Sequence, residues 1–225
     1  KWDMAPLLKK LRIAKDGELC IHASGLELIE GFFKRRADMY SCVYHHAVSR
    51  VVEAMYGALI RRAKELQRQG SIVFADEMMC TLLSADRSDQ VATNHLLKAT
   101  DSWWNYHMQE WMEHPDSVLR YLAQSLVLRR LYKHFPDNDY YRNMLMKMIE
   151  DAGLDAKYSL LEIPPVRSNH KQDLARGIRL LNPDGSSSSL ENHSRLLQAM
   201  IETTQYAPTS LLAIPLEPFD KLKLT

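Results

Sequence analysis

The chain has 225 residues, of which 46% are hydrophobic and 25% are charged, as in globular proteins that bury a sizeable core. Its formal net charge of +1 argues against a generally basic surface for nucleic acid. No apolar run reaches the roughly 18–20 residues that cross a bilayer, and no signal peptide is visible. We therefore expect an intracellular, cytoplasmic protein with no membrane partner.

Three cysteines, Cys20, Cys42 and Cys80, are widely spaced and form no CxxC pair. They are typical of reduced, mostly buried thiols rather than of a zinc site. The chain begins at Lys1, without a methionine and in mid-pattern, which indicates part of a longer polypeptide.

The N-terminal region predicts a β-hairpin followed by a helix. Apolar residues alternate within Leu11–His22, and Asp16-Gly17 is a strong two-residue turn signal. Ser24 followed by Glu27 resembles a capping box, so a helix is expected to begin near Gly25.

A long amphipathic helical segment is predicted over Phe33–Leu66, ending at Gln69-Gly70. Apolar residues recur there at three- and four-residue spacing, namely Val43, Ala47, Val51, Ala54, Met55, Ala58 and Leu59. Charged residues fall elsewhere on the helix, namely Arg50, Glu53, Arg61, Lys64 and Glu65. This pattern is typical of a helix with one face in the core.

The rest of the chain predicts more helices and then a short mixed region. The expected helices are Asp76–Leu83, Asp89–Ala99, Ser102–Met112, Pro115–His134, Asp139–Ala152 and one near Glu191–Thr203. The expected strands are Tyr158–Ile163, Gly177–Leu181 and Leu211–Leu216, with a loop at Ser186–Ser189. The predicted fold class is mainly α, with a helical domain over residues 1–153 and a small α+β region over 154–225.

The first candidate site is an Arg/Tyr/His group on the long helix, comprising Arg35, Arg36, Tyr40, Tyr44, His45 and His46. On a helix, Arg36, Tyr40 and Tyr44 fall at i, i+4 and i+8, on nearly one face. A guanidinium can grip phosphate oxygens bidentately, and a phenol can pack on a sugar or base. The alternative is that the arginines are solvated and the tyrosines are core residues. Adjacent helical histidines diverge by about 100° and seldom share a metal.

Two further groups have simple alternatives. Arg129 and Lys133, with Arg130 and His134 beside them, would repel each other at helical spacing unless an anion or a carboxylate lies between them. A solvated helix face explains them equally well. An aromatic group comprises Trp103, Trp104, Tyr106 and Trp111. It is typical of a core or a subunit interface, although a base-stacking platform is an alternative.

Common catalytic motifs are absent from the sequence. It contains no GxxxxGK[ST], GxGxxG, GxSxG or HExxH, and no His-Asp dipeptide. From the residues alone, the chain is a helical domain with a candidate anion-binding cluster.

Several stretches nevertheless resemble one family, the HD-domain phosphohydrolases that act on deoxynucleoside triphosphates (dNTPs). KRRADMYSCVYHHAV (34–48) is similar to a helical segment of the family, and the specific matches are Arg36–His46 within it and RRLYK (129–133). KWD at the start, LRIAKDGELCI (11–21) and NPDG (182–185) are similar to other family elements in the same order. The resemblance covers most of the chain.

The resemblance implies roles for particular residues. Lys1 and Arg36 would contact substrate phosphates, and Tyr44 would pack against the deoxyribose and help reject a 2′-hydroxyl. Tyr40 and His45 match neighbouring pocket positions. Arg129 and Lys133 match residues that hold an activating nucleotide at a subunit interface, which implies a homo-oligomer, either a dimer or a tetramer.

The sequence also departs from the family. The H…HD…D set, which holds a divalent metal (Mg, Mn, Fe or Zn), is absent and would lie upstream of Lys1. Met4-Ala5-Pro6 stands where the family has Y-x3-RD. The resemblance therefore implies metal-dependent hydrolysis of dNTPs to deoxynucleoside and triphosphate, provided that metal ligands lie upstream. The alternatives are a catalytically inactive nucleotide-binding or assembly subunit, and a single-stranded nucleic-acid binder, which the near-neutral charge disfavours.

Overall fold

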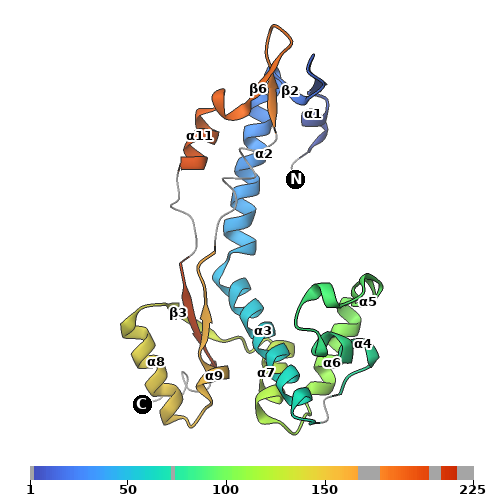
Figure 1. The fold of residues 1–225 in the computed structure, drawn as a ribbon. Coiled ribbons are helices and arrows are strands. Elements are labelled where there is room, and N and C mark those ends of the chain that lie inside the picture. The colour runs from blue at the N-terminus through green and yellow to red at the C-terminus, as the bar shows by residue number, and fades with distance from the viewer. Residues whose placement is uncertain (1–2, 72–73, 167–177, 203–208, 217–225) are drawn as a thin grey trace. The chain divides into compact units, whose positions relative to one another are not determined.

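A computed structural model describes residues 3–71, 74–166, 178–202 and 209–216 and shows a mainly α fold with two small sheets (Figure 1). The chain divides into two compact units. Unit 1 comprises Lys1–His46 and Pro165–Thr209, and unit 2 comprises Ala47–Pro164 and Ser210–Thr225. This division does not coincide with the boundary expected after residue 153, so the domain assignment from sequence stays a prediction.

Unit 1 contains a four-stranded sheet of order β1-β2-β5-β6. Its strands are β1 (Leu11–Ile13), β2 (Leu19–His22), β5 (Arg179–Leu181) and β6 (Ser187–Ser189). The predicted hairpin is confirmed, because β1 and β2 pair antiparallel and Gly17 adopts the positive φ of 81° that its turn requires. Strands β2 and β5 pair in parallel, although about 160 residues separate them in the sequence.

The loop expected at Ser186–Ser189 is wrong, because Ser187–Ser189 forms an edge strand beside β5. No apolar alternation signals it. Arg179 instead holds the strand with its side chain: Nε donates to Ser187 Oγ at 2.6 Å and Nη2 donates to the Ser187 carbonyl at 2.8 Å.

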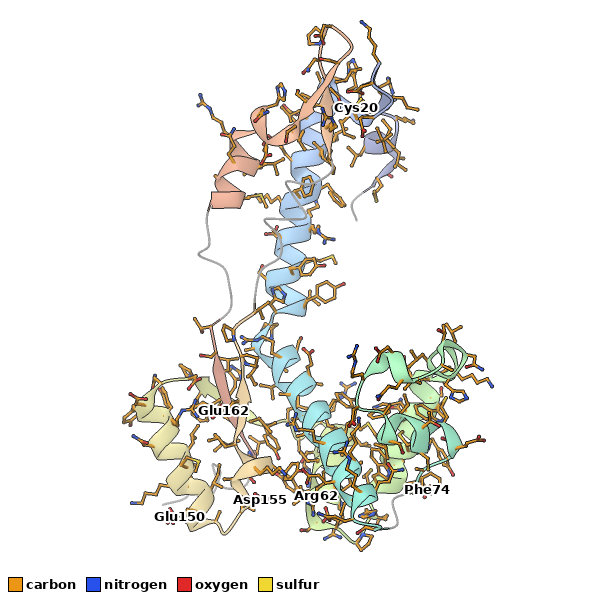
Figure 2. The ribbon with its side chains drawn as sticks, viewed as in Figure 1. Cys20, Arg62, Phe74, Glu150, Asp155 and Glu162 are labelled. Carbon is orange, nitrogen blue, oxygen red and sulfur yellow. The ribbon has the colours of Figure 1, made fainter. Side chains whose placement is uncertain are left out.

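Helix α2 (Leu26–Met39) contributes Ile29 and Phe33 to the core that this sheet shares. Short elements surround it, namely α1 (Ala5–Leu8), η1 (Ala23–Gly25), η4 (Leu190–Asn192) and α11 (Arg195–Glu202). The core of unit 1 consists of Leu7, Ile21, Ile29, Phe33, Leu180, Leu190 and Leu197. Cys20 of β2 is buried as expected (Figure 2), whereas Cys42 and Cys80 are exposed, contrary to expectation.

The predicted capping box at Ser24 is wrong. Its hydroxyl accepts from Lys10 Nζ at 3.0 Å instead of capping α2. His22 Nδ1 accepts from the Ser24 backbone N–H at 3.2 Å, so the preceding histidine provides the cap, for the short helix η1. An imidazole acceptor at this place has no counterpart in the usual Ser/Thr/Asp/Asn capping pattern.

Unit 2 is built around α3 (Ala47–Arg68), which packs against α7 (Ser117–Val127). Other helices are α4 (Glu77–Ser84), η3 (Ser88–Gln90), α5 (Thr93–Lys98), α6 (Asp101–Trp111), α8 (Asp139–Asp151) and α9 (Ala156–Ser159). As predicted, Val51, Met55, Ala58 and Leu59 of α3 are buried, and Gly70 follows the helix with a φ of 74°.

The second sheet has the order β3-β7-β4 and is antiparallel throughout. Its strands are β3 (Lys133–Pro136), β7 (Leu211–Ile214) and β4 (Leu161–Ile163). Leu145 and Ile149 of α8 pack against Leu212 and Ile214 of β7, forming a small core of their own. The part predicted as strand at Tyr158 is the end of the short helix α9.

The helix predicted over Pro115–His134 is wrong at both ends. Helix α7 begins at Ser117 and not at Pro115, because the Asp116 carboxylate accepts from Leu119 N at 2.8 Å and caps the helix. The helix ends at Val127, and Arg129 just beyond it has a φ of 56°, which a right-handed helix does not allow. Lys133 and His134 therefore lie on a strand.

Two residues of the long helical segment also differ from the amphipathic pattern. Val43 is 54% exposed, although its spacing predicts a core position. Arg50 is only 6% exposed, although its charge predicts a solvated position, and it donates to the Pro164 carbonyl at 2.7 Å.

Among the described residues, none of the helices has both the length and the apolar character to cross a bilayer.

Candidate functional site

The long helical segment changes geometry at the residues singled out from the sequence. Helix α2 ends at Met39, a π-helical turn occupies Tyr40–Tyr44, and α3 begins at Ala47. The backbone N–H of His45 donates to the Tyr40 carbonyl at 2.7 Å, an i→i−5 bond. Single π turns within helices are rare and are often found at functional sites. The expected continuous α-helix is therefore wrong at this point.

Four predicted site residues, Arg36, Tyr40, Tyr44 and His45, meet at this turn, and we call them the Arg36 cluster. The Arg36 guanidinium carbon lies 4.9 Å from the centre of the Tyr40 ring, and Nη2 lies 3.3 Å from the Tyr40 hydroxyl. The Tyr40 ring centre lies 5.1 Å from that of Tyr44 and 5.5 Å from that of His45. Spacing predicted the grouping of Arg36 with the two tyrosines; the position of His45 depends on the π turn.

The Arg36 cluster lies at the surface of unit 1. Tyr44 is 54% exposed, whereas Arg36, Tyr40 and His45 are half-buried. The alternative in which both tyrosines are core residues is therefore wrong for Tyr44. An exposed phenol ring beside a stacked guanidinium can pack against a sugar or base while the guanidinium binds an anion. Lys1, the other expected phosphate contact, lies outside the described residues.

The RRLYK segment (Arg129–Lys133) follows α7 in unit 2. The Arg129 N–H donates to the Leu126 carbonyl at 3.2 Å, and the Arg130 N–H donates to the Ser125 carbonyl at 2.8 Å. These two bonds define a Schellman motif in which Arg129 occupies the left-handed position that glycine usually takes. A turn and a strand thus present Arg129 and Lys133, rather than one helical face.

Arg129 occupies this left-handed position although glycine would be less strained there. A non-glycine residue there costs roughly 1–2 kcal/mol, and nothing in the turn itself requires an arginine. Both Arg129 and Lys133 are exposed, whereas Tyr132 between them is buried and donates its hydroxyl to the Tyr158 carbonyl at 3.1 Å. The buried tyrosine anchors the segment and leaves the two cations at the surface.

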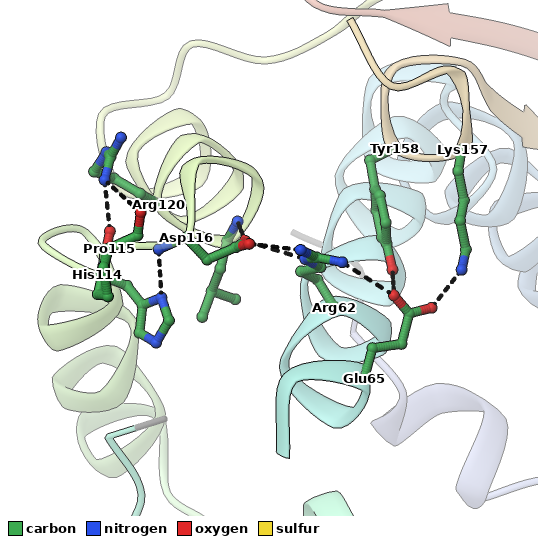
Figure 3. A network of polar contacts seen from close by, with 9 residues as sticks. Arg62, Glu65, His114, Pro115, Asp116, Arg120, Lys157 and Tyr158 are labelled. Atoms are coloured by element: carbon green, nitrogen blue, oxygen red, sulfur yellow. Dashed lines mark hydrogen bonds and ion pairs between the residues drawn. The ribbon is translucent and has the colours of Figure 1, made fainter. Parts of the chain in front are cut away.

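Pairwise ion contacts hold the helices of unit 2 around α3 (Figure 3). Arg62 of α3 binds Asp116, the cap of α7, and contacts Glu65 at 3.4 Å. Glu65 accepts from Tyr158 Oη at 2.5 Å and from Lys157 Nζ at 2.6 Å. The hydrogen bond from Arg62 lowers the pKa of Asp116, while burial and Glu65 raise the pKa of Tyr158 to about 12. Sequence spacing gave no sign of this network, because its members lie on three separate helices.

The tryptophans expected in a core or interface are held within unit 2. Trp111 is fully buried and donates from Nε1 to the Phe74 carbonyl at 2.8 Å. Trp103 Nε1 donates to Asp76 Oδ2 at 2.6 Å, and the centre of the His107 ring lies 4.7 Å from that of Trp103 in a tilted arrangement. The core interpretation is confirmed for Trp111, and the base-stacking alternative has no support from it.

A divalent metal was expected from the resemblance. Within the part of the chain that the structure describes, no three His, Cys, Asp or Glu side chains come together to hold one. The described residues thus do not form a metal site by themselves. What the Arg36 cluster offers chemically is anion binding and ring packing.

Comparison with known proteins identifies the family. The family model described as "HD associated region" matches residues 2–211. The chain belongs to this family. It is 24% identical over 214 residues to the uncharacterized protein YwfO of Bacillus subtilis, covering 88% of this chain and 47% of that protein.

Two solved structures show the same fold. One is a phosphohydrolase from Bacteroides thetaiotaomicron, with a TM-score of 0.76 and 23% identity over 95% of this chain and 55% of that chain. The other is a hypothetical protein from Aquifex aeolicus, with a TM-score of 0.59 and 17% identity over 100% of this chain and 51% of that chain. The chain thus spans about half the length of the relatives it matches.

Proposed function

We propose that this chain provides the phosphate- and sugar-binding part of a metal-dependent phosphohydrolase that converts dNTPs to deoxynucleoside and triphosphate. The observation that carries the proposal is the Arg36 cluster, in which a guanidinium, two phenols and an imidazole meet at one exposed π turn. Membership of the HD associated region family supports it, as does the fold shared with a protein named a phosphohydrolase.

Each residue has a role in this proposal. Arg36 binds the triphosphate and neutralises charge that develops on its oxygens during hydrolysis. Tyr44 packs on the deoxyribose, since its ring is the exposed member of the cluster. A divalent metal, held by ligands that would lie outside the described residues, would supply polarisation of the phosphate and an activated water.

We further propose that the RRLYK segment binds an activating nucleotide phosphate. Support comes from the backbone of Arg129, whose positive φ strains an arginine but would not strain a glycine. Lys133 supplies a second exposed cation at the start of β3. If the nucleotide lies between subunits, the protein is a homo-oligomer.

The decisive experiment measures inorganic triphosphate released from dNTPs by the full-length protein with Mg²⁺ or Mn²⁺. Arg36→Ala should lower kcat/KM about 100-fold, as for the loss of one electrostatic contact to a transition state. Arg35→Ala is the matched control, because Arg35 is an exposed neighbour whose Nη1 donates to the Gly31 carbonyl, outside the cluster. Its activity should stay within about twofold of the unmodified protein.

The same assay separates the alternatives. Intact dNTPs after long incubation, together with saturable dNTP binding, would favour a catalytically inactive nucleotide-binding subunit. If the protein neither binds nor hydrolyses dNTPs, both the hydrolase and the nucleotide-binding subunit are excluded. Steeply salt-dependent binding of single-stranded oligonucleotides would favour the nucleic-acid alternative.

A further inference from the structure

The three other members of the Arg36 cluster all contact Tyr40. The guanidinium of Arg36 lies over its ring, and the rings of Tyr44 and His45 lie beside it at 5.1 and 5.5 Å. Tyr40 is half-buried, whereas Tyr44 is 54% exposed. Tyr40 is therefore the centre of the cluster and is less accessible to a ligand than Tyr44.

The π turn explains how two successive residues reach the same ring. In an α-helix, residues i+4 and i+5 point about 40° and about 140° away from residue i, so only the first lies on its face. A turn closed by an i→i−5 bond contains one more residue. Residue i+5 then returns toward residue i, which places His45 beside Tyr40 together with Tyr44.

We propose that Tyr40 is a positioning residue, which holds Arg36 and the two neighbouring rings in their binding arrangement without contacting the ligand itself. This proposal rests on the phosphate-binding role proposed above for Arg36. Tyr40 acts through its ring face, on which the guanidinium stacks, and through its hydroxyl, which accepts from Arg36 Nη2 at 3.3 Å.

The benefit of this arrangement is preorganisation. A guanidinium donates bidentately to phosphate only when its plane is correctly oriented, and stacking on an aromatic face fixes that plane. An arginine ordered before binding loses less rotamer freedom when the ligand arrives. Loss of the stack should therefore weaken phosphate binding about 10-fold.

The test is a double-mutant cycle on the full-length protein, with the dissociation constant of inorganic triphosphate measured by calorimetry. Tyr40→Leu should weaken binding about 10-fold and Tyr40→Phe, which keeps the ring face, less than about 3-fold. In an Arg36→Lys background, which keeps the charge but lacks the planar fork, Tyr40→Leu should change the constant less than about 2-fold. Circular dichroism and thermal melting confirm that each variant is folded.

Tyr140→Leu is the matched control. Tyr140 lies on α8, is 71% exposed and has its ring 5.2 Å from that of Tyr141, so the change removes an exposed ring pair outside the cluster. Triphosphate binding should not change. In the absence of ligand, the Arg36 Nε–H resonance should broaden or shift in Tyr40→Leu and not in Tyr140→Leu.

The outcomes distinguish this proposal from the proposed function. An equal loss of affinity in the unmodified and the Arg36→Lys backgrounds would mean that Tyr40 contacts triphosphate directly, and would overturn the positioning role alone. Triphosphate binding by Tyr40→Leu that matches the unmodified protein would do the same. If the unmodified protein does not bind triphosphate at all, the phosphate-binding role of Arg36 fails first and the positioning role fails with it.

Discussion

Arg62 of α3 holds both carboxylate oxygens of Asp116 at the start of α7: Nε lies 3.1 Å from Oδ1 and Nη2 lies 2.5 Å from Oδ2. The same Oδ1 accepts from Leu119 N at 2.8 Å. One carboxylate thus caps a helix and joins it to the central helix of unit 2. Both side chains are mostly buried, with exposures of 20% and 16%.

Replacing Arg62 should destabilise unit 2. In Arg62→Met the mostly buried Asp116 carboxylate loses its counter-charge, and we expect the free energy of unfolding to fall by about 2–4 kcal/mol. Urea unfolding followed by circular dichroism measures the change. The control is Arg87→Met, because Arg87 and its partner Asp89 are 76% and 62% exposed. The control should cost less than about 0.5 kcal/mol, and equal effects of the two changes would contradict the prediction.

The pKa of Asp116 gives this pair a pH dependence. The hydrogen bond from Arg62 lowers the pKa of Asp116 in the folded state below its unfolded value of about 3.9. Its contribution to stability is therefore present above the unfolded pKa and is lost as the pH falls through the folded pKa. Asp116→Asn keeps a capping side chain but removes the titration. Below about pH 4, the free energy of unfolding of the variant should fall less steeply with decreasing pH than that of the unmodified protein. If the two proteins lose stability in parallel, the prediction is contradicted.

The protein should be more stable with glycine than with arginine at position 129. Glycine adopts a positive φ without the clash that costs other residues roughly 1–2 kcal/mol, so Arg129→Gly should raise the free energy of unfolding by about 1 kcal/mol. If the RRLYK segment binds nucleotide phosphate, the same variant should lose activation by nucleotide. Arg130→Gly, at the next residue, has no positive φ to relieve and should not stabilise the protein. Stabilisation without loss of activation would show that the guanidinium has no regulatory role.

Tyr44 should determine the choice of sugar. A phenol packed on a deoxyribose leaves little room for a 2′-hydroxyl, so Tyr44→Ala should raise the ratio of ribonucleotide to deoxynucleotide hydrolysis. We expect a change of about 10-fold, comparable to other small steric differences in a binding pocket. Competition assays with paired ribo- and deoxynucleoside triphosphates measure it. Cys42→Ala, a change at an exposed residue of the same π turn, should leave the ratio unchanged.

The sequence predicted elements whose signals are local. The Asp16-Gly17 hairpin and the apolar spacing of α3 follow from turn chemistry and helical periodicity, and both are confirmed. Strand β6 has no such signal, because serine hydroxyls and Arg179 hold it rather than apolar residues. The end of α7 was also missed, since an arginine stands where a glycine would have marked the stop.

The candidate site shows the same limit. Helical spacing was enough to group Arg36 with Tyr40 and Tyr44. It could not place His45, because an α-helix directs residue i+5 to another face and no propensity rule signals a π turn. The contacts of Arg62 were equally hidden, since Asp116 is 54 residues away in the sequence.

The parallel pairing of β2 with β5 has a consequence for synthesis of the protein. Cys20 and Ile21 leave the ribosome long before their partners Arg179 and Leu180, with almost all of unit 2 translated in between. The sheet of unit 1 can therefore close only after residues 47–164 of unit 2 have emerged, and closure must bring together strands separated by a long stretch of chain. A nascent chain halted at Pro164 would contain the hairpin and α2 but would lack both β5 and β6. Folding of unit 1 is thus a late event, and premature termination leaves β2 without its partner strand.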